Sequence, residues 1–177
     1  MIEGKKDKKE QKGEESEIWV DIGAGRNPLG MLRKKLEELE GKVYIGIDIS
    51  PGEFLINRNW LKLFKVKAKE ILHIVASGEK LPIKDNSCDQ VFLANFLGDP
   101  KISQETKEKA LQEAFRILKP GGLLNIIERW TPPPKNEVIK MIQNLGFEFV
   151  KEDTFIGVNT YQWDPAYDYY LIFRKLT

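Results

Sequence analysis

A glycine-rich turn follows the first apolar run of the chain. Residues 20–25 read Val-Asp-Ile-Gly-Ala-Gly, and a segment with helical periodicity comes next. Glycines at such a turn let the backbone approach a ligand closely, because a Cβ would fill the space that the ligand needs. A dinucleotide-binding turn would place a third glycine where Pro28 stands. The residues predicted to face a ligand here are Gly23, Ala24 and Gly25.

Two acidic residues are candidates for contact with the same ligand: one lies just before this turn, and the other follows it at the end of the next apolar run. Asp21 precedes the first glycine, where it would repel a pyrophosphate and attract a cationic group. Asp48 ends the next apolar run, about one strand-helix-strand unit later, where a carboxylate can accept hydrogen bonds from both hydroxyls of a ribose. Together, the glycine turn and Asp48 predict a nucleoside site.

Short apolar runs rich in β-branched residues alternate with helix-period segments from Ile18 onward. This alternation predicts a parallel sheet with helices on both faces. The predicted strands are residues 18–22, 43–47, 71–75, 90–95 and 123–128. The predicted helices are residues 29–40, a stretch near 59–67, 104–118 and 136–145.

The last part of the chain has a different pattern. Residues 147–155 and 167–175 are extended runs with no helix-period segment between them, so we expect them to pair antiparallel at one sheet edge. The predicted fold is α/β: a doubly wound, mostly parallel seven-stranded sheet with helices on both faces and an antiparallel C-terminal strand pair. Residues 1–17 are charged and almost free of apolar side chains, which predicts a flexible tail before one domain, residues 18–177.

Composition excludes several classes of function. The 28 basic and 27 acidic residues nearly cancel, so no overall field points to nucleic acid or to an anionic membrane. One cysteine, Cys88, and one histidine, His73, cannot build a Cys/His zinc site, and we expect no metal. No run of 18 apolar residues and no signal-peptide pattern is present, which favours a cytoplasmic protein without a membrane segment.

Several segments together resemble the class I, Rossmann-like S-adenosylmethionine-dependent methyltransferases, especially the ubiquinone and menaquinone biosynthesis branch. The similar segments are residues 20–25, 46–48, 76–82, 85–89 and 114–122, so the resemblance spans about residues 19–128. It implies methyl transfer with S-adenosyl-L-methionine as the cofactor. The chain departs from the family pattern at Ser77, where the family often has Asp, and at Asn27, where a small residue is usual.

The resemblance also implies which residues contact the cofactor. The methionine part would lie on the glycine turn with Asp21, the ribose on Asp48, the adenine beside Ile49, and the adenine edge at Ser77 and Gly78. The implied cofactor-binding set is Asp21, Gly23, Ala24, Gly25, Asp48, Ile49, Ser77, Gly78 and Asn95.

Two further residues are candidates for catalysis. Methyl transfer from a sulfonium is an in-line displacement with a neutral leaving group, so alignment matters most and a base is optional. Asn95, at the end of a predicted strand, could position an acceptor or be an ordinary strand-end residue. Asp99 could take a proton, but Gly-Asp-Pro is also common turn chemistry, and we favour the turn.

Three functions remain open at this point. The leading one is methyl transfer to an O, N or C atom of a small molecule. The second is methylation of structured RNA, and the third is a catalytically silent cofactor-binding partner subunit. The RNA hypothesis depends on an acid-free basic stretch, although a solvated helix face explains the same residues more simply. That stretch comprises Arg58, Lys62, Lys65, Lys67 and Lys69.

Overall fold

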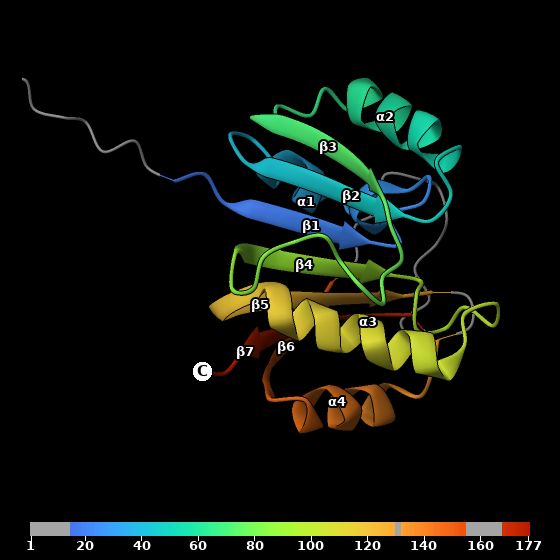
Figure 1. Ribbon diagram of the computed structural model, residues 1–177, viewed down its shortest axis with the longest axis vertical. Coiled ribbons are helices and arrows are strands. Elements are labelled where there is room, and N and C mark those ends of the chain that lie inside the picture. Colours follow the sequence, from blue (N-terminus) through green and yellow to red (C-terminus); the bar gives the residue numbers. More distant parts are fainter. Residues whose placement is uncertain (1–14, 130–131, 155–167) are drawn as a thin grey trace, which may run out of the picture.

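The computed structural model describes residues 15–129, 132–154 and 168–177 (Figure 1). Most of the predicted tail, residues 1–14, lies outside the described residues, as do residues 130–131 and 155–167. No helix in the described ranges is long and apolar enough to span a bilayer.

A seven-stranded sheet forms the middle layer, in the order β3-β2-β1-β4-β5-β7-β6. The pairs among β3, β2, β1, β4 and β5 are parallel, and β7 is antiparallel to both β5 and β6. This arrangement confirms the predicted fold class. The strands are β1 (Ile18–Ile22), β2 (Val43–Asp48), β3 (Glu70–Val75), β4 (Cys88–Ala94), β5 (Leu118–Glu128), β6 (Phe147–Asp153) and β7 (Tyr169–Lys175).

Helices cover both faces of the sheet, and each face has its own apolar core. The 3-10 helix η1 (Pro28–Met31), α1 (Arg33–Glu38) and α2 (Glu53–Leu63) pack on one face, where Leu36 and Leu61 are buried. The opposite face is covered by α3 (Gln104–Ile117) and α4 (Lys135–Asn144). The helices of that face contribute Ala110, Leu111, Ala114, Ile117, Val138 and Ile142 to the core.

The first two helical segments differ from the sequence prediction. Residues 29–40 were expected to form one helix, but Leu29, Gly30 and Met31 all have positive φ, which breaks the chain into η1 and α1. The second helix begins at Glu53 and ends at Leu63, so it lies earlier than the predicted stretch near 59–67. It ends there because Lys65 adopts a left-handed backbone, with φ of 51°.

The strand order creates the crevice in which doubly wound sheets bind ligands. Strand β1 lies between β2 and β4. The chain continues from β1 to β2 in one direction across the sheet, and from β4 to β5 in the opposite direction. A crevice opens at the carboxyl ends of strands where such a reversal occurs. The glycine turn after β1, the Asp48 end of β2 and the loop after β4 meet at this edge.

Candidate cofactor and acceptor site

A cavity of about 320 Å³ lies at the carboxyl ends of β1, β2 and β4. We call it the strand-end cavity. It combines the glycine turn, the end of β2, the segment after β3 and the loop after β4. Its lining residues are Gly23, Gly25, Asp48, Ile49, Ala76, Ser77, Gly78, Ala94, Asn95, Phe96, Asp99, Ile102 and Thr106. The structure thus brings together eight of the ten predicted site residues, the exceptions being Asp21 and Ala24.

The glycine turn is shaped by left-handed backbone at Gly23 and Gly25, with φ of 69° and 46°. A Cβ at Gly23 would lie 2.8 Å from Cδ2 of Phe96, so any larger residue at this position would force the ring to move. The N–H of Ala24 donates to the carbonyl of Ile47 at 2.9 Å, which fixes the turn to the end of β2. Ala24 is buried and therefore anchors the turn, outside the cavity lining.

Asp48 joins the glycine turn to the loop that follows β2. Its Oδ2 accepts from the backbone N–H of Gly25 at 2.9 Å, and its Oδ1 accepts from that of Ser50 at 2.8 Å. An ionised carboxylate has about four acceptor positions, so it can still take hydrogen bonds from a ligand. The carboxylate lines the cavity and is held in one orientation by the backbone on both sides.

Asp21 lies under the turn rather than in the cavity. Its side chain is fully buried, and Oδ2 accepts from the N–H of Leu29 at 2.7 Å and from the hydroxyl of Tyr44 at 3.0 Å. Oδ1 has no hydrogen-bond partner among the described residues. Burial, the largest cause, raises the pKa of this carboxyl to about 7. Its expected contact with a cationic ligand stays a prediction, while its observed bonds hold the chain that follows the turn.

A polar network behind the turn was not recognised from the sequence. The buried Asn57 donates from Nδ2 to the carbonyl of Gly25 at 3.1 Å, and its Oδ1 lies 3.0 Å from Nε2 of His73. Arg58 donates to Nδ1 of His73 at 3.3 Å. Burial lowers the pKa of His73 to about 4, so the ring is neutral at neutral pH. His73 is therefore a hydrogen-bonded structural residue that supports the turn through Asn57.

The loop after β4 forms the other wall. Asn95 has φ of 52°, its N–H donates to the carbonyl of Ile127 at 2.7 Å, and its Oδ1 accepts from the N–H of Arg129 at 2.9 Å. Asp99 accepts from the N–H of Lys101 at 2.8 Å through Oδ1, which is turn chemistry. Both residues line the cavity, so both can reach a ligand there.

Glu128 fixes this loop, which the sequence did not reveal. Its buried carboxylate accepts from three consecutive backbone N–H groups: Phe96 and Leu97 donate at 3.0 and 2.7 Å, and Gly98 at 3.0 Å. Burial raises the pKa of Glu128 to about 7, although the three donors lower it. The carboxylate therefore fixes the backbone of the loop whose Phe96 ring lies beside Gly23. A glutamate at the end of a central strand was the only sequence signal of this role.

The segment after β3 closes the cavity on the adenine side that the resemblance implies. Ser77 uses its hydroxyl locally, accepting from the N–H of Glu79 at 3.2 Å. A Cβ at Gly78 would lie 3.0 Å from Cγ2 of Ile22, so a larger residue here would push against the side chain of Ile22 in β1. Ile49 is 70% exposed at the cavity rim, where an apolar side chain can cover a flat ring.

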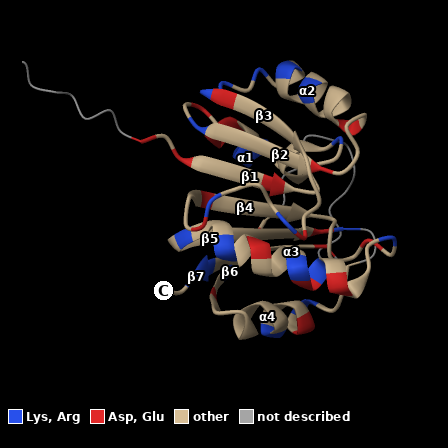
Figure 2. Ribbon diagram, viewed as in Figure 1, with Lys and Arg blue, Asp and Glu red and all other residues tan. Residues whose placement is uncertain are grey.

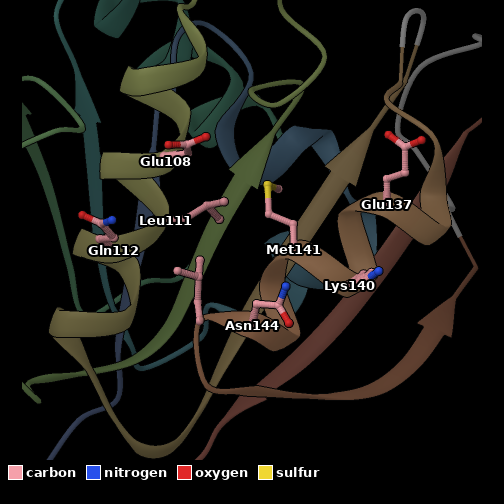
Figure 3. A pocket seen from close by; sticks show the side chains of 8 residues that line it. Glu108, Leu111, Gln112, Glu137, Lys140, Met141 and Asn144 are labelled. Atoms are coloured by element: carbon pink, nitrogen blue, oxygen red, sulfur yellow. The ribbon is translucent and has the colours of Figure 1, made fainter.

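A larger hollow of about 430 Å³ lies between α3 and α4 (Figure 3). It is lined by helix side chains: Glu108, Leu111, Gln112, Glu137, Lys140, Met141, Asn144 and Leu145. It shares no residue with the strand-end cavity and contains no glycine turn or strand-end carboxylate. Chemistry that depends on those features therefore belongs to the smaller cavity.

Comparison with known proteins agrees with this geometry. Residues 20–126 match the family described as Methyltransferase domain. The chain therefore belongs to this family of S-adenosylmethionine-dependent methyltransferases. The chain is 32% identical over 131 residues to the ubiquinone/menaquinone biosynthesis C-methyltransferase UbiE of Pseudomonas fluorescens. That match covers 74% of this chain and 48% of the relative, so the chain spans about half the length of this relative.

Solved structures show the same fold at lower identity. A SAM-dependent methyltransferase from Methanosarcina mazei has a TM-score of 0.65 at 17% identity, covering 92% of this chain and 93% of that one. The methyltransferase seen in complex with the Trm112 activator of Haloferax volcanii has a TM-score of 0.67 at 17% identity, covering 94% and 85%. At this identity the likeness establishes the fold and nothing about substrate or partner.

The family implies S-adenosylmethionine as the cofactor, and the residues of the strand-end cavity fit it. The glycine turn leaves room where a Cβ would intrude, and Asp48 presents a carboxylate for ribose hydroxyls. The cavity lining also includes the apolar Ile49 and the small residues Ser77 and Gly78, which suit an adenine ring. The volume lies within the range of small-molecule sites.

Proposed function

We propose that this domain binds S-adenosylmethionine in the strand-end cavity and transfers its methyl group to a small-molecule acceptor. The observation that supports this most is the meeting of Gly23, Gly25 and Asp48 with Asn95 and Phe96 around one cavity. The glycine turn and Asp48 fit a sulfur nucleoside, while Asn95 and Phe96 belong to the loop after β4, which lines the same cavity. The same cavity can therefore bring cofactor and acceptor together.

When bound, the cofactor supplies an electrophilic methyl group on a positively charged sulfur. The contribution of the chain is alignment, because a neutral thioether leaves and little charge has to be stabilised. Asp48 would hold the ribose, and the loop fixed by Glu128 would hold the acceptor at a set distance. Asp99, the second carboxylate in the cavity lining beside Asp48, could accept a proton from the acceptor.

We propose an activated ring carbon, as in a quinol, as the acceptor atom. The name of the Pseudomonas fluorescens relative specifies C-methylation in quinone biosynthesis, and this chain shares 32% identity with it. Phe96 lines the cavity and supplies an aromatic surface for a flat ring. After methyl transfer such a carbon loses a proton to restore the ring, which gives Asp99 a role.

Transfer of a radioactive methyl group tests this proposal against the two alternatives. The protein is incubated with methyl-labelled S-adenosylmethionine and either a demethylated naphthoquinol or a cell extract, which is then separated into small-molecule, RNA and protein fractions. We expect label in the naphthoquinol and in the small-molecule fraction. Label in RNA alone would instead establish the RNA alternative. Binding of the cofactor without label in any fraction would indicate the silent partner subunit.

The basic stretch gives the RNA alternative limited support. Arg58 donates to His73, Lys67 forms an ion pair with Glu40 at 3.7 Å, and Lys69 donates to Ser16 at 2.9 Å. Lys62 and Lys65 remain as exposed cations next to exposed apolar residues, and these belong to α2 and its end. They line a hollow separate from the strand-end cavity.

A further inference from the structure

Exposed apolar side chains are concentrated at one edge of the molecule. Of the nine large apolar residues exposed in the described ranges, seven lie between residues 49 and 75, in or near α2 and β3. Isolated exposed apolar residues are normal, but a group on adjacent elements marks a binding surface. Within β3 the exposed fractions are 38% for Ile71, 38% for Leu72 and 58% for Val75.

The backbone of β3 is also open on one side. β3 is the terminal strand of the sheet and pairs only with β2 in the described part of the chain. Ala76 donates to the carbonyl of Asp48 at 3.1 Å. Because every second N–H group of a strand points to the same neighbour, the N–H groups at residues 70, 72 and 74 also point toward β2. The N–H and C=O groups of Ile71, His73 and Val75 therefore point outward, in the arrangement that accepts an added strand.

Basic side chains lie beside this open edge. Arg58, Lys62 and Lys65 line a hollow of about 430 Å³ together with Leu61, Val66 and Ile71. Figure 2 shows the blue segments of α2 next to β3. Neither Lys62 nor Lys65 forms an ion pair with an acidic residue in the ranges that the structure describes. The positive charge at this edge is thus available to a partner.

The two faces of β3 differ in a way that constrains an added strand. Ile71 lines the hollow with α2, and His73 contacts Phe54 of α2, so odd-numbered residues face that helix. Leu72 points to the opposite face, because successive residues of a strand alternate. An added strand would therefore place every second side chain beside the basic residues and the others beside Leu72.

We propose that the β3-edge surface, formed by Arg58, Lys62, Lys65, Ile71, Leu72 and Val75, binds an extended segment of a partner protein in which acidic and apolar residues alternate. The segment adds a strand to β3, with its acidic side chains toward α2 and its apolar ones toward Leu72. Charge complementarity favours this occupant over a second copy. A two-fold β3–β3 pair would bring two basic α2 rows together, and like charges repel.

The probe is a fluorescent peptide of about eight alternating Glu and Val residues, a common strand length. Its counterpart carries Lys in place of Glu and has the same apolar face. We expect the Glu peptide to bind the full chain and the Lys peptide to fail. Hydrogen exchange should slow at the amides of Ile71, His73 and Val75 when the Glu peptide is added.

Two variants and a matched control decide the question. Lys62→Glu with Lys65→Glu reverses charge on exposed side chains, and we expect the dissociation constant to rise at least about tenfold. Ile71→Pro removes an outward N–H without breaking the ladder to β2, a change that edge strands tolerate, and should also abolish binding. Lys84→Glu with Lys140→Glu makes the same charge change on exposed residues outside this surface and should leave binding unchanged.

Several results would overturn the proposal. Equal binding of both peptides would show that charge plays no part, and exchange protection elsewhere would place the peptide on another surface. A concentration-dependent dimer that Ile71→Pro abolishes would assign the edge to a second copy. Binding of single-stranded RNA, lost in the Lys62→Glu with Lys65→Glu variant while the Glu peptide does not bind, would assign it to RNA. If Ile71→Pro unfolds the chain, the charge-reversal variant and its control still decide. The proposal does not depend on methyl transfer, so it can fail alone.

Discussion

At the scale of single residues, the two acids near the glycine turn have different positions. Asp48 lines the strand-end cavity, while Asp21 is buried beneath the turn and holds Leu29 and Tyr44. Sequence position alone could not separate them, because each follows or lies within an apolar run. What separates them is burial: Asp21 is fully enclosed with one carboxylate oxygen unpartnered among the described residues.

The buried acids predict how stability depends on pH. The folded state raises the pKa of Asp21 from 3.8 to about 7 and that of Glu128 from 4.5 to about 7. The folded chain thus keeps protons that the unfolded chain releases, so this stability is present at low pH and is lost as pH rises through about 7. Between pH 4 and 8 we expect the free energy of unfolding to fall less in Asp21→Asn than in the wild type, by up to about 4 kcal/mol.

Urea unfolding of both proteins at several pH values measures this effect. Part of the slope should remain in Asp21→Asn, because Glu128 still titrates. Asparagine can accept the bonds from Leu29 and Tyr44 through its own oxygen, so the variant should fold. Parallel stability profiles for the two proteins would show that the Asp21 carboxyl is ionised throughout.

At the scale of elements, the glycine turn and the loop after β4 work as one unit. A Cβ added at Gly23 would meet the Phe96 ring, and Glu128 accepts from the backbone N–H of Phe96. Gly23 and Gly41 offer a matched pair, with φ of 69° and 74°, but a Cβ at Gly41 would meet nothing within 4 Å. Gly41→Ala therefore tests backbone strain alone, which costs about 1 to 2 kcal/mol.

Gly23→Ala should add steric conflict to that strain. We expect it to lower stability by about 1 to 3 kcal/mol more than Gly41→Ala and to weaken binding of S-adenosylhomocysteine at least tenfold, since Phe96 must move. Gly41→Ala should leave that affinity unchanged. Urea unfolding and titration calorimetry measure both quantities. Equal effects of the two substitutions would mean that the turn and the loop are not coupled.

Elements with a strong periodic pattern could be predicted closely, and those set by unusual backbone could not. The strand at residues 18–22 and the start of α3 at Gln104 agree with the sequence prediction. The break between η1 and α1 depends on left-handed backbone at Leu29 and Met31. Leucine and methionine rarely adopt this conformation, so the sequence does not predict it. The shift of α2 has a similar cause, because its end is fixed by Lys65 rather than by a proline or glycine.

At the scale of the whole molecule, the fold and the meeting of the glycine turn with Asp48 around one cavity could be predicted from the sequence, but the supporting contacts could not. The alternation of strands and helices places the glycine turn and Asp48 at one sheet edge. The hydrogen bonds between Asn57 and His73, and between Glu128 and the loop after β4, join residues 16 to 32 positions apart. The local sequence pattern carries no information on such pairs. The three-dimensional crossing of the chain brings them together.

The central claim is that the strand-end cavity binds a sulfur nucleoside through Asp48. Titration calorimetry with S-adenosylhomocysteine tests it directly, with circular dichroism to show that each variant is folded. We expect one site per chain in the wild type and loss of measurable binding in Asp48→Ala, because the ribose hydroxyls lose their acceptor. Unchanged affinity in a folded Asp48→Ala variant, or no binding by the wild type, would contradict the account.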